Sequence, residues 1–182
     1  MCDGHRTAVA SPRAAVVDWS QRIPGGGDDD ETGQGRLMRV CVYAASSAKV
    51  APGFHAAARA LGATLAREGC SIVYGGGSQG LMGSLADGAL AEGGEVVGIL
   101  PRFMADLEWG HPGLTHLELV EDMRERKHKL LTGSDAVVAL PGGCGTLEEL
   151  FEAITLKRLG IYFSPILLLN TRGFYAPRVR GS

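Results

Sequence analysis

A strand, a glycine turn and a helix are predicted in direct succession at residues 135–160, and this succession constrains the fold most. Residues 136–140 are apolar and partly β-branched, which is typical of a buried strand. Three glycines within residues 141–145 then break the strand. From Thr146 onward, one apolar helix face is formed by Leu147, Leu150, Phe151 and Ile154. Because N–H groups and the helix dipole both face such a turn, the segment predicts an anion site.

The acidic side of this helix has two explanations. Its three glutamates, on the side opposite the apolar stripe, are Glu148, Glu149 and Glu152. Thr146 and Glu149 have the spacing of a capping box, which would satisfy helix N–H groups without any ligand. A solvated face would also explain the glutamates. A ligand site is favoured because closely spaced glycines let the backbone approach a ligand, and residues 75–80 form a second such turn.

Strands and helices alternate along the chain, which predicts an α/β fold. We expect a Rossmann-like doubly wound parallel sheet with helices on both faces. Ligands of such sheets bind beyond the carboxyl ends of the strands, where both glycine turns would lie. The irregular segment 102–113, which contains Trp109, is expected to form a loop over that site. Residues 1–37 lack periodicity and predict a disordered tail, followed by a single domain at 38–182.

Composition excludes several classes of protein. The 182 residues carry a formal charge of −2 without a clustered basic excess, so no nucleic-acid partner is expected. No apolar run approaches the roughly 20 residues that span a bilayer, so we expect no membrane partner. The four cysteines are scattered without a C-x-x-C pair, which argues against a zinc cage and fits a reducing cytoplasm. Cys144 could be a nucleophile, although we expect a small buried thiol.

The second glycine turn has the form of a dinucleotide fingerprint. Gly75, Gly77 and Gly80 satisfy its spacing. A dinucleotide site also needs a carboxylate at the end of the following strand, and residues 99–101 provide none. The turn therefore favours a mononucleotide site or a close backbone crossing.

Three motifs resemble those of a known family. PGGCGTLEE at 141–149 resembles the PGGxGTxxE motif of the Lonely Guy (LOG) family, the cytokinin riboside 5′-monophosphate phosphoribohydrolases, long mislabelled as lysine decarboxylases. GGGSQGLMG at 75–83 and MRERK at 123–127 extend the resemblance over residues 39–175. It implies a homodimer that hydrolyses the N-glycosidic bond of AMP or N6-isopentenyl-AMP without a metal or organic cofactor. Family members usually continue beyond Tyr175, so we expect a shortened C-terminal end.

The resemblance also assigns roles to single residues. It implies that Glu149 and Arg126 are catalytic, although the run RERKHK around Arg126 is by itself typical of a solvated helix face. The expected substrate-binding residues are Ser46, Gly76, Gly77, Glu108, Lys127, Gly142, Gly143, Cys144, Gly145, Thr146, Leu147, Glu148 and Thr155. Leu156 and Arg158 stand where the family usually has tryptophan and glutamine, which leaves the preferred base open.

One alternative function remains. Related folds with the same glycine motifs carry nucleotide-like cofactors, including molybdenum cofactor, without cleaving them. A binding or carrier protein is therefore the second hypothesis. A lysine decarboxylase is discarded, because no segment marks a pyridoxal phosphate lysine.

Overall fold

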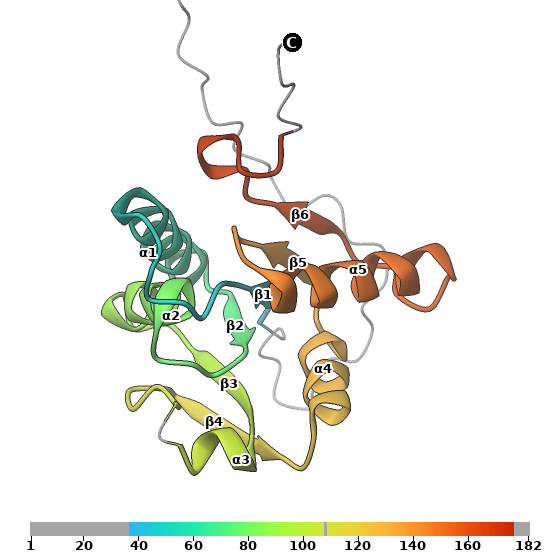
Figure 1. Ribbon diagram of the computed structural model, residues 1–182, viewed down its shortest axis with the longest axis horizontal. Helices are drawn as coiled ribbons and strands as arrows, with labels where there is room; N and C mark the ends of the chain where they lie inside the picture. Colours follow the sequence, from blue (N-terminus) through green and yellow to red (C-terminus); the bar gives the residue numbers. More distant parts are fainter. Residues whose placement is uncertain (1–36, 108, 177–182) are drawn as a thin grey trace, which may run out of the picture. The chain divides into compact units, whose positions relative to one another are not determined.

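The computed structural model describes residues 37–107 and 109–176 (Figure 1). The strands are β1 (Arg39–Tyr43), β2 (Ser71–Tyr74), β3 (Val96–Pro101), β4 (His116–Val120), β5 (Ala136–Ala139) and β6 (Ile166–Leu168). The helices are α1 (Pro52–Arg67), α2 (Gly80–Ala91), α3 (Arg102–Ala105), α4 (Met123–Leu131), α5 (Cys144–Arg158) and the 3₁₀ turn η2 (Thr171–Gly173). The predicted tail at 1–37 lies outside the described residues except for Leu37, and the expected C-terminal shortening concerns residues beyond 176.

The six strands form one sheet in the order β4-β3-β2-β1-β5-β6, and every neighbouring pair is parallel. The α/β prediction of a doubly wound parallel sheet is thus confirmed. The chain moves outward from β1 in one direction through β4 and then returns to β5 on the other side of β1. This reversal places the carboxyl ends of β2 and β5 on either side of β1, where such sheets bind ligands.

Helices cover both faces of the sheet. Figure 1 shows α1 and α2 on one side and α4 and α5 on the other. Alternate residues of β1 face the two layers: Val40 and Val42 belong to the core with α1 and α2, and Cys41 and Tyr43 to the core with α4 and α5. Burial on both faces explains why the strands are continuously apolar in sequence.

Two glycines let α1 and α2 touch through their backbones. A methyl group at Gly62 would overlap the Leu85 carbonyl oxygen, and one at Gly88 would overlap that of Arg59. Side chains at either position would push the helices apart. This contact fixes α2, whose N-terminus follows the glycine turn after β2.

Two local predictions were wrong, and one alternative explanation is excluded. The segment 102–113 is not wholly irregular, because it contains α3. Cys144 is exposed rather than buried, because it occupies the first position of α5. The capping box does not form: the N-cap of α5 is Gly143 without a side-chain cap, so Thr146 lies three residues inside the helix. Among the described residues, no helix is long and apolar enough to cross a membrane.

Candidate functional site

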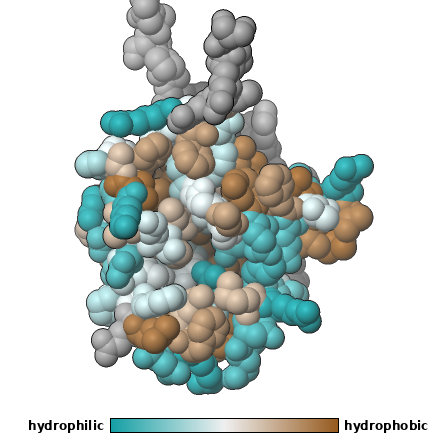
Figure 2. All heavy atoms as spheres, viewed as in Figure 1, coloured by the Kyte–Doolittle hydropathy of each residue, from teal (hydrophilic) through white to brown (hydrophobic). Residues whose placement is uncertain are grey.

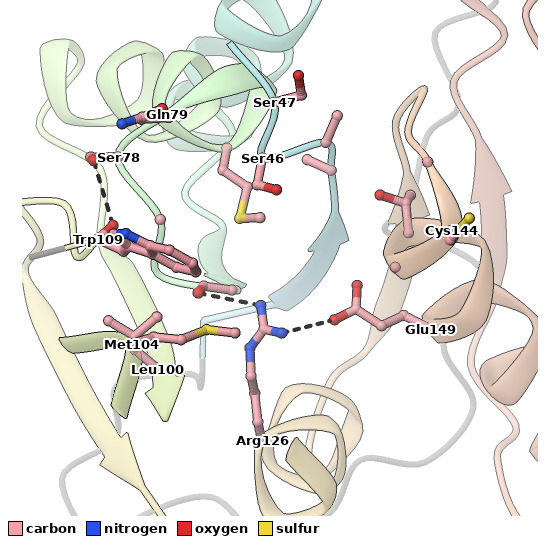
Figure 3. A pocket seen from close by; sticks show the side chains of 18 of the residues that line it. Ser46, Ser47, Ser78, Gln79, Leu100, Met104, Trp109, Arg126, Cys144 and Glu149 are labelled. Carbon is pink, nitrogen blue, oxygen red and sulfur yellow. Dashed lines mark hydrogen bonds and ion pairs between the residues drawn. The ribbon is translucent and has the colours of Figure 1, made fainter. Parts of the chain in front are cut away.

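A pocket of about 600 Å³ lies at the carboxyl edge of the sheet (Figure 3). The two glycine turns, the end of β1 and parts of α4 and α5 form its wall. The described lining residues are Ala44, Ala45, Ser46, Ser47, Gly75, Gly77, Ser78, Gln79, Met82, Leu100, Met104, Trp109, Met123, Arg126, Gly143, Cys144, Gly145, Thr146 and Glu149.

The structure brings about half of the predicted site residues to this pocket. Those that line it are Ser46, Gly77, Arg126, Gly143, Cys144, Gly145, Thr146 and Glu149. Those not among the lining residues are Gly76, Lys127, Gly142, Leu147, Glu148 and Thr155. Glu108 lies outside the described residues. The lining residues that the sequence analysis did not assign are mainly apolar. Of these, Met104 and Trp109 lie in the expected loop over the site, and Met82 and Met123 lie in two of the three family motifs.

Arg126 lies beneath the pocket, although its sequence surroundings are typical of a solvated face. Asp122 is the N-cap of helix α4, and its side chain accepts hydrogen bonds from the N–H groups of Arg124 and Glu125. The Arg126 side chain then extends under the sheet edge, where Nε donates to the Ile99 carbonyl at 3.2 Å and Nη2 to the Gly75 carbonyl at 3.4 Å. The guanidinium is therefore held by backbone acceptors from two strand ends.

Gly75 makes room for this guanidinium. A methyl group on its Cα would overlap Nη2 of Arg126. The first glycine of the upstream turn therefore serves a side chain 51 residues away. The sequence shows the glycine but not its partner.

Glu149 faces Arg126 from the second turn of α5. Its Oε1 lies 3.5 Å from Arg126 Nη1, and the two side chains are 11% and 9% exposed. Burial raises the pKa of the Glu149 carboxyl above its ordinary value, and the positive charge of Arg126 opposes this effect. Neighbouring Glu148 adds to the rise. The site thus holds a desolvated carboxylate beside a fixed cation.

Lys127, next to Arg126, points to the outer side of α5. Its Nζ lies 2.5 Å from Glu148 and 2.9 Å from Glu152, and these contacts raise the pKa of Lys127. Two of the three glutamates thus tie α4 to α5, and Glu149 alone of the three lines the pocket. Thr155 lies farther along α5, where its exposed hydroxyl donates to the Phe151 carbonyl.

The N-terminus of α5 presents donors to the pocket. The first intrahelical bond of this turn runs from the Leu147 N–H to the Gly143 carbonyl, so the N–H groups before it have no acceptor within the helix. The Thr146 side chain is buried at the same end, and a methyl group at Gly142 would overlap its hydroxyl. With the helix dipole, this end can hold an anion. The described residues contain no cluster of three or more metal-ligating side chains.

Comparisons with known proteins identify the family. Residues 82–180 match the family model described as "Possible lysine decarboxylase". The chain is 40% identical over 142 residues to a cytokinin riboside 5′-monophosphate phosphoribohydrolase of Arabidopsis thaliana, covering 78% of this chain and 67% of the relative. The chain belongs to the LOG family. The resemblance predicted from the three motifs is confirmed.

Two further relatives of the chain have names that describe the same enzyme. The enzyme of that name from Rhodococcoides fascians is 47% identical over 121 residues, covering 66% of this LOG chain and 61% of the relative. A protein of Oryza sativa subsp. japonica named a probable enzyme of this kind is 44% identical over 144 residues, covering 79% and 65%. The chain thus spans about two thirds of the length of these curated relatives.

Solved structures share the fold. The X-ray structure of the protein TM1055 matches with a TM-score of 0.63 and 31% identity, covering 79% of this LOG chain and 80% of the other. The molybdenum cofactor carrier protein of Chlamydomonas reinhardtii matches with a TM-score of 0.61 and 25% identity, covering 73% and 76%.

Proposed function

We propose that this chain hydrolyses the N-glycosidic bond of a purine nucleoside 5′-monophosphate, either AMP or an N6-substituted form such as N6-isopentenyl-AMP. The products are the free base and ribose 5-phosphate. The observation that carries the proposal is the Arg126–Glu149 pair, buried beside a helix N-terminus that can hold a phosphate. The names of the curated LOG relatives support the same reaction.

The 5′-phosphate binds at the start of α5 in this proposal. The N–H groups of Gly143, Gly145 and Thr146, together with the Thr146 hydroxyl, supply donors, and Ser46 and Gly77 line the opposite wall. Because the phosphate does not react, its binding energy is used to position the ribose. The ribose then lies near Glu149, one helical turn away from the phosphate.

The proposed reaction adds water across the bond between C1′ and the base nitrogen. As this bond breaks, positive charge develops on the sugar and the base leaves with the electron pair. Glu149 stabilises the sugar and takes a proton from the water, whose oxygen bonds to C1′. Arg126 stabilises the negative charge of the base until the base is protonated. The buried, raised-pKa carboxyl suits this role of general base.

Product analysis tests the proposal. The purified protein is incubated with AMP and, separately, with N6-isopentenyl-AMP, and free base is measured by chromatography. Release of base that is lost in Glu149→Gln supports hydrolysis and ranks the two substrates. Absence of base release from both nucleotides would overturn it.

The carrier hypothesis remains the second candidate because a structural neighbour is named a molybdenum cofactor carrier protein. Such a protein needs a pocket but no general base. Hydrolysis is preferred because a carrier gives no reason to bury Glu149 against Arg126. Nucleotide binding in calorimetry without base release would favour the carrier.

We also propose a cytoplasmic homodimer. Large apolar side chains are exposed on α5 and the residues after it, and Figure 2 shows hydrophobic atoms gathered over this end. They include Phe151, Ile154, Leu159, Ile161 and Phe163. Exposed apolar area of this kind is typical of an interface. Sedimentation of wild type and Phe151→Asp tests the dimer, which the substitution should weaken.

The described cysteines are free thiols, which fits the proposed cytoplasmic location, a reducing compartment.

A further inference from the structure

Trp109 lies on the pocket wall opposite the start of α5. Figure 3 shows it with Met104 and Leu100 on one side of the pocket, while Cys144 and Glu149 lie on the other side and Arg126 lies between the two groups. Of the described residues that line the pocket, Trp109 is the only aromatic one. About half of it is exposed (52%), so an indole surface is available to a ligand.

Backbone hydrogen bonds attach Trp109 to the upstream glycine turn. Its carbonyl accepts the Ser78 N–H at 3.1 Å, and its own N–H donates to the Met104 carbonyl at 3.3 Å. Two residues later, the His111 N–H donates to the Gly76 carbonyl at 2.9 Å, and Gly110 forms an antiparallel bridge with Gly77. The loop therefore continues the wall of the pocket.

A side-chain contact attaches the same loop to α2. The Gly113 N–H donates to Nδ1 of His111 at 3.1 Å, which leaves Nε2 to donate to Asp87 at 3.1 Å. Asp87 in turn accepts from Arg59 of α1 at 2.8 Å. Because these contacts fix the loop before any ligand arrives, little ordering entropy is lost when a ligand binds against Trp109.

We infer that the Trp109 indole is the platform on which the base of the nucleotide stacks, an inference that rests on the proposed function. The anion site at α5 and the indole lie on opposite walls, so a ligand with a phosphate at one end extends its other end toward Trp109. Figure 3 shows the apolar side chains of Leu100 and Met104 on the same side of the pocket as the indole. A flat heteroaromatic ring gains stacking and apolar burial there.

Fluorescence provides a direct test, because the chain has two tryptophans, Trp19 and Trp109. In Trp19→Phe, emission comes from Trp109 alone. AMP should quench this emission with a saturable dependence on concentration, whereas ribose 5-phosphate, which lacks the base, should not. Equal responses to both ligands would overturn the inference, and so would a failure of AMP to change the emission.

Calorimetry of AMP and ribose 5-phosphate provides the second test. Stacking on one aromatic side chain corresponds to a loss of about 5- to 150-fold in affinity on truncation to alanine. Trp109→Ala should weaken AMP by this factor and leave ribose 5-phosphate unchanged, and Trp109→Phe should restore most of the AMP affinity. Equal weakening of both ligands would reduce Trp109 to a structural role and overturn the inference.

The outcomes also separate this inference from the proposed function. If Trp109→Ala changes neither base release nor AMP affinity, the platform is overturned and the hydrolase is kept. AMP binding that depends on Trp109, with no base release from AMP or N6-isopentenyl-AMP, overturns the hydrolase and keeps the platform. A wild-type protein that binds neither nucleotide overturns both.

Discussion

The Arg126 guanidinium and the Glu149 carboxylate face each other at 3.5 Å in the wall of the pocket, and both are almost excluded from solvent. The free energy needed to remove two charges from water can exceed the free energy gained from their attraction. The raised pKa of Glu149 indicates that Arg126 does not fully offset this cost. A buried carboxyl whose charged form is disfavoured by burial fits a catalytic role better than a structural one.

Replacing Glu149 by glutamine should stop turnover and preserve binding. The amide keeps the size of the side chain but can neither take a proton nor stabilise positive charge. We expect kcat for base release to fall about 10²- to 10⁴-fold, the usual contribution of a general base, with AMP affinity in calorimetry nearly unchanged. Glu148→Gln is the matched control, since Glu148 is the preceding residue, is 56% exposed and pairs with Lys127 outside the pocket. Equal losses in both variants would remove Glu149 from the mechanism.

As the pH is lowered, activity should be lost at a higher pH than it would be if the general base were a carboxyl of ordinary pKa. The proposed base works only when ionised, and burial raises the pKa of Glu149 above its ordinary value of 4.5. The acidic limb of a plot of kcat/KM against pH should therefore have its midpoint above 4.5. A midpoint at or below 4.5 would assign the base to another group.

The same shift makes a prediction for stability. The folded state binds the Glu149 proton more tightly than the unfolded chain, so ionisation removes stability as the pH rises from 4.5 through the folded-state pKa. Urea unfolding of wild type and Glu149→Gln at pH 4 and pH 7 measures this. The free energy of unfolding of the variant, relative to wild type, should be higher at pH 7 than at pH 4. The opposite order would show that Arg126 more than offsets the burial.

A methyl group at Gly75 should impair catalysis through Arg126. In Gly75→Ala the new Cβ would overlap Nη2, so the guanidinium must move away from the Gly75 carbonyl and from Glu149. We expect a loss of kcat of about tenfold or more, since small displacements of catalytic groups cost this much. A double-mutant cycle with Arg126→Ala measures the coupling. If Gly75→Ala lowers kcat by the same factor in the wild type and in Arg126→Ala, the glycine does not act through Arg126.

The glycine turns and the fold class could be predicted because their signals are local. A strand, closely spaced glycines and a helical period follow one another within residues 135–160, so the start of α5 was placed within a few residues. The alternative explanation, a capping box formed by Thr146 and Glu149, is excluded by the structure. The spacing of Thr146 and Glu149 is the same whether Thr146 precedes the helix or lies inside it, and the observed N-cap is Gly143.

Contacts between distant segments could not be predicted in the same way. The sequence around Arg126 is typical of a charged helix face, and it does not show that the side chain reaches the Gly75 carbonyl after β2, 51 residues earlier. Lys127 has the same sequence surroundings and takes the other direction, toward Glu148 and Glu152. Trp109 is positioned largely by backbone hydrogen bonds, including one with the upstream glycine turn. Every residue type except proline can form such bonds, so the residue types do not reveal which segments they join.

Binding of the phosphate should depend on Thr146 and, through it, on Gly142. Thr146→Ala removes a hydroxyl at the start of α5, where a phosphate would lie. Gly142→Ala keeps the hydroxyl, but its Cβ would overlap the Thr146 side chain and displace it. Both variants should weaken AMP binding by about 10- to 150-fold, the range for one hydrogen bond to a charged group. Adenosine, which lacks the phosphate, should lose much less affinity in either variant.

The comparison of the two ligands separates binding of the phosphate from damage to the fold. A variant that merely disturbs the pocket weakens AMP and adenosine by the same factor. Thr146→Ser supplies the matched control, since serine keeps the hydroxyl and loses only the methyl group. Thr146→Ser should bind AMP about as well as the wild type does. A loss as large as that of Thr146→Ala would show that the hydroxyl does not hold the phosphate.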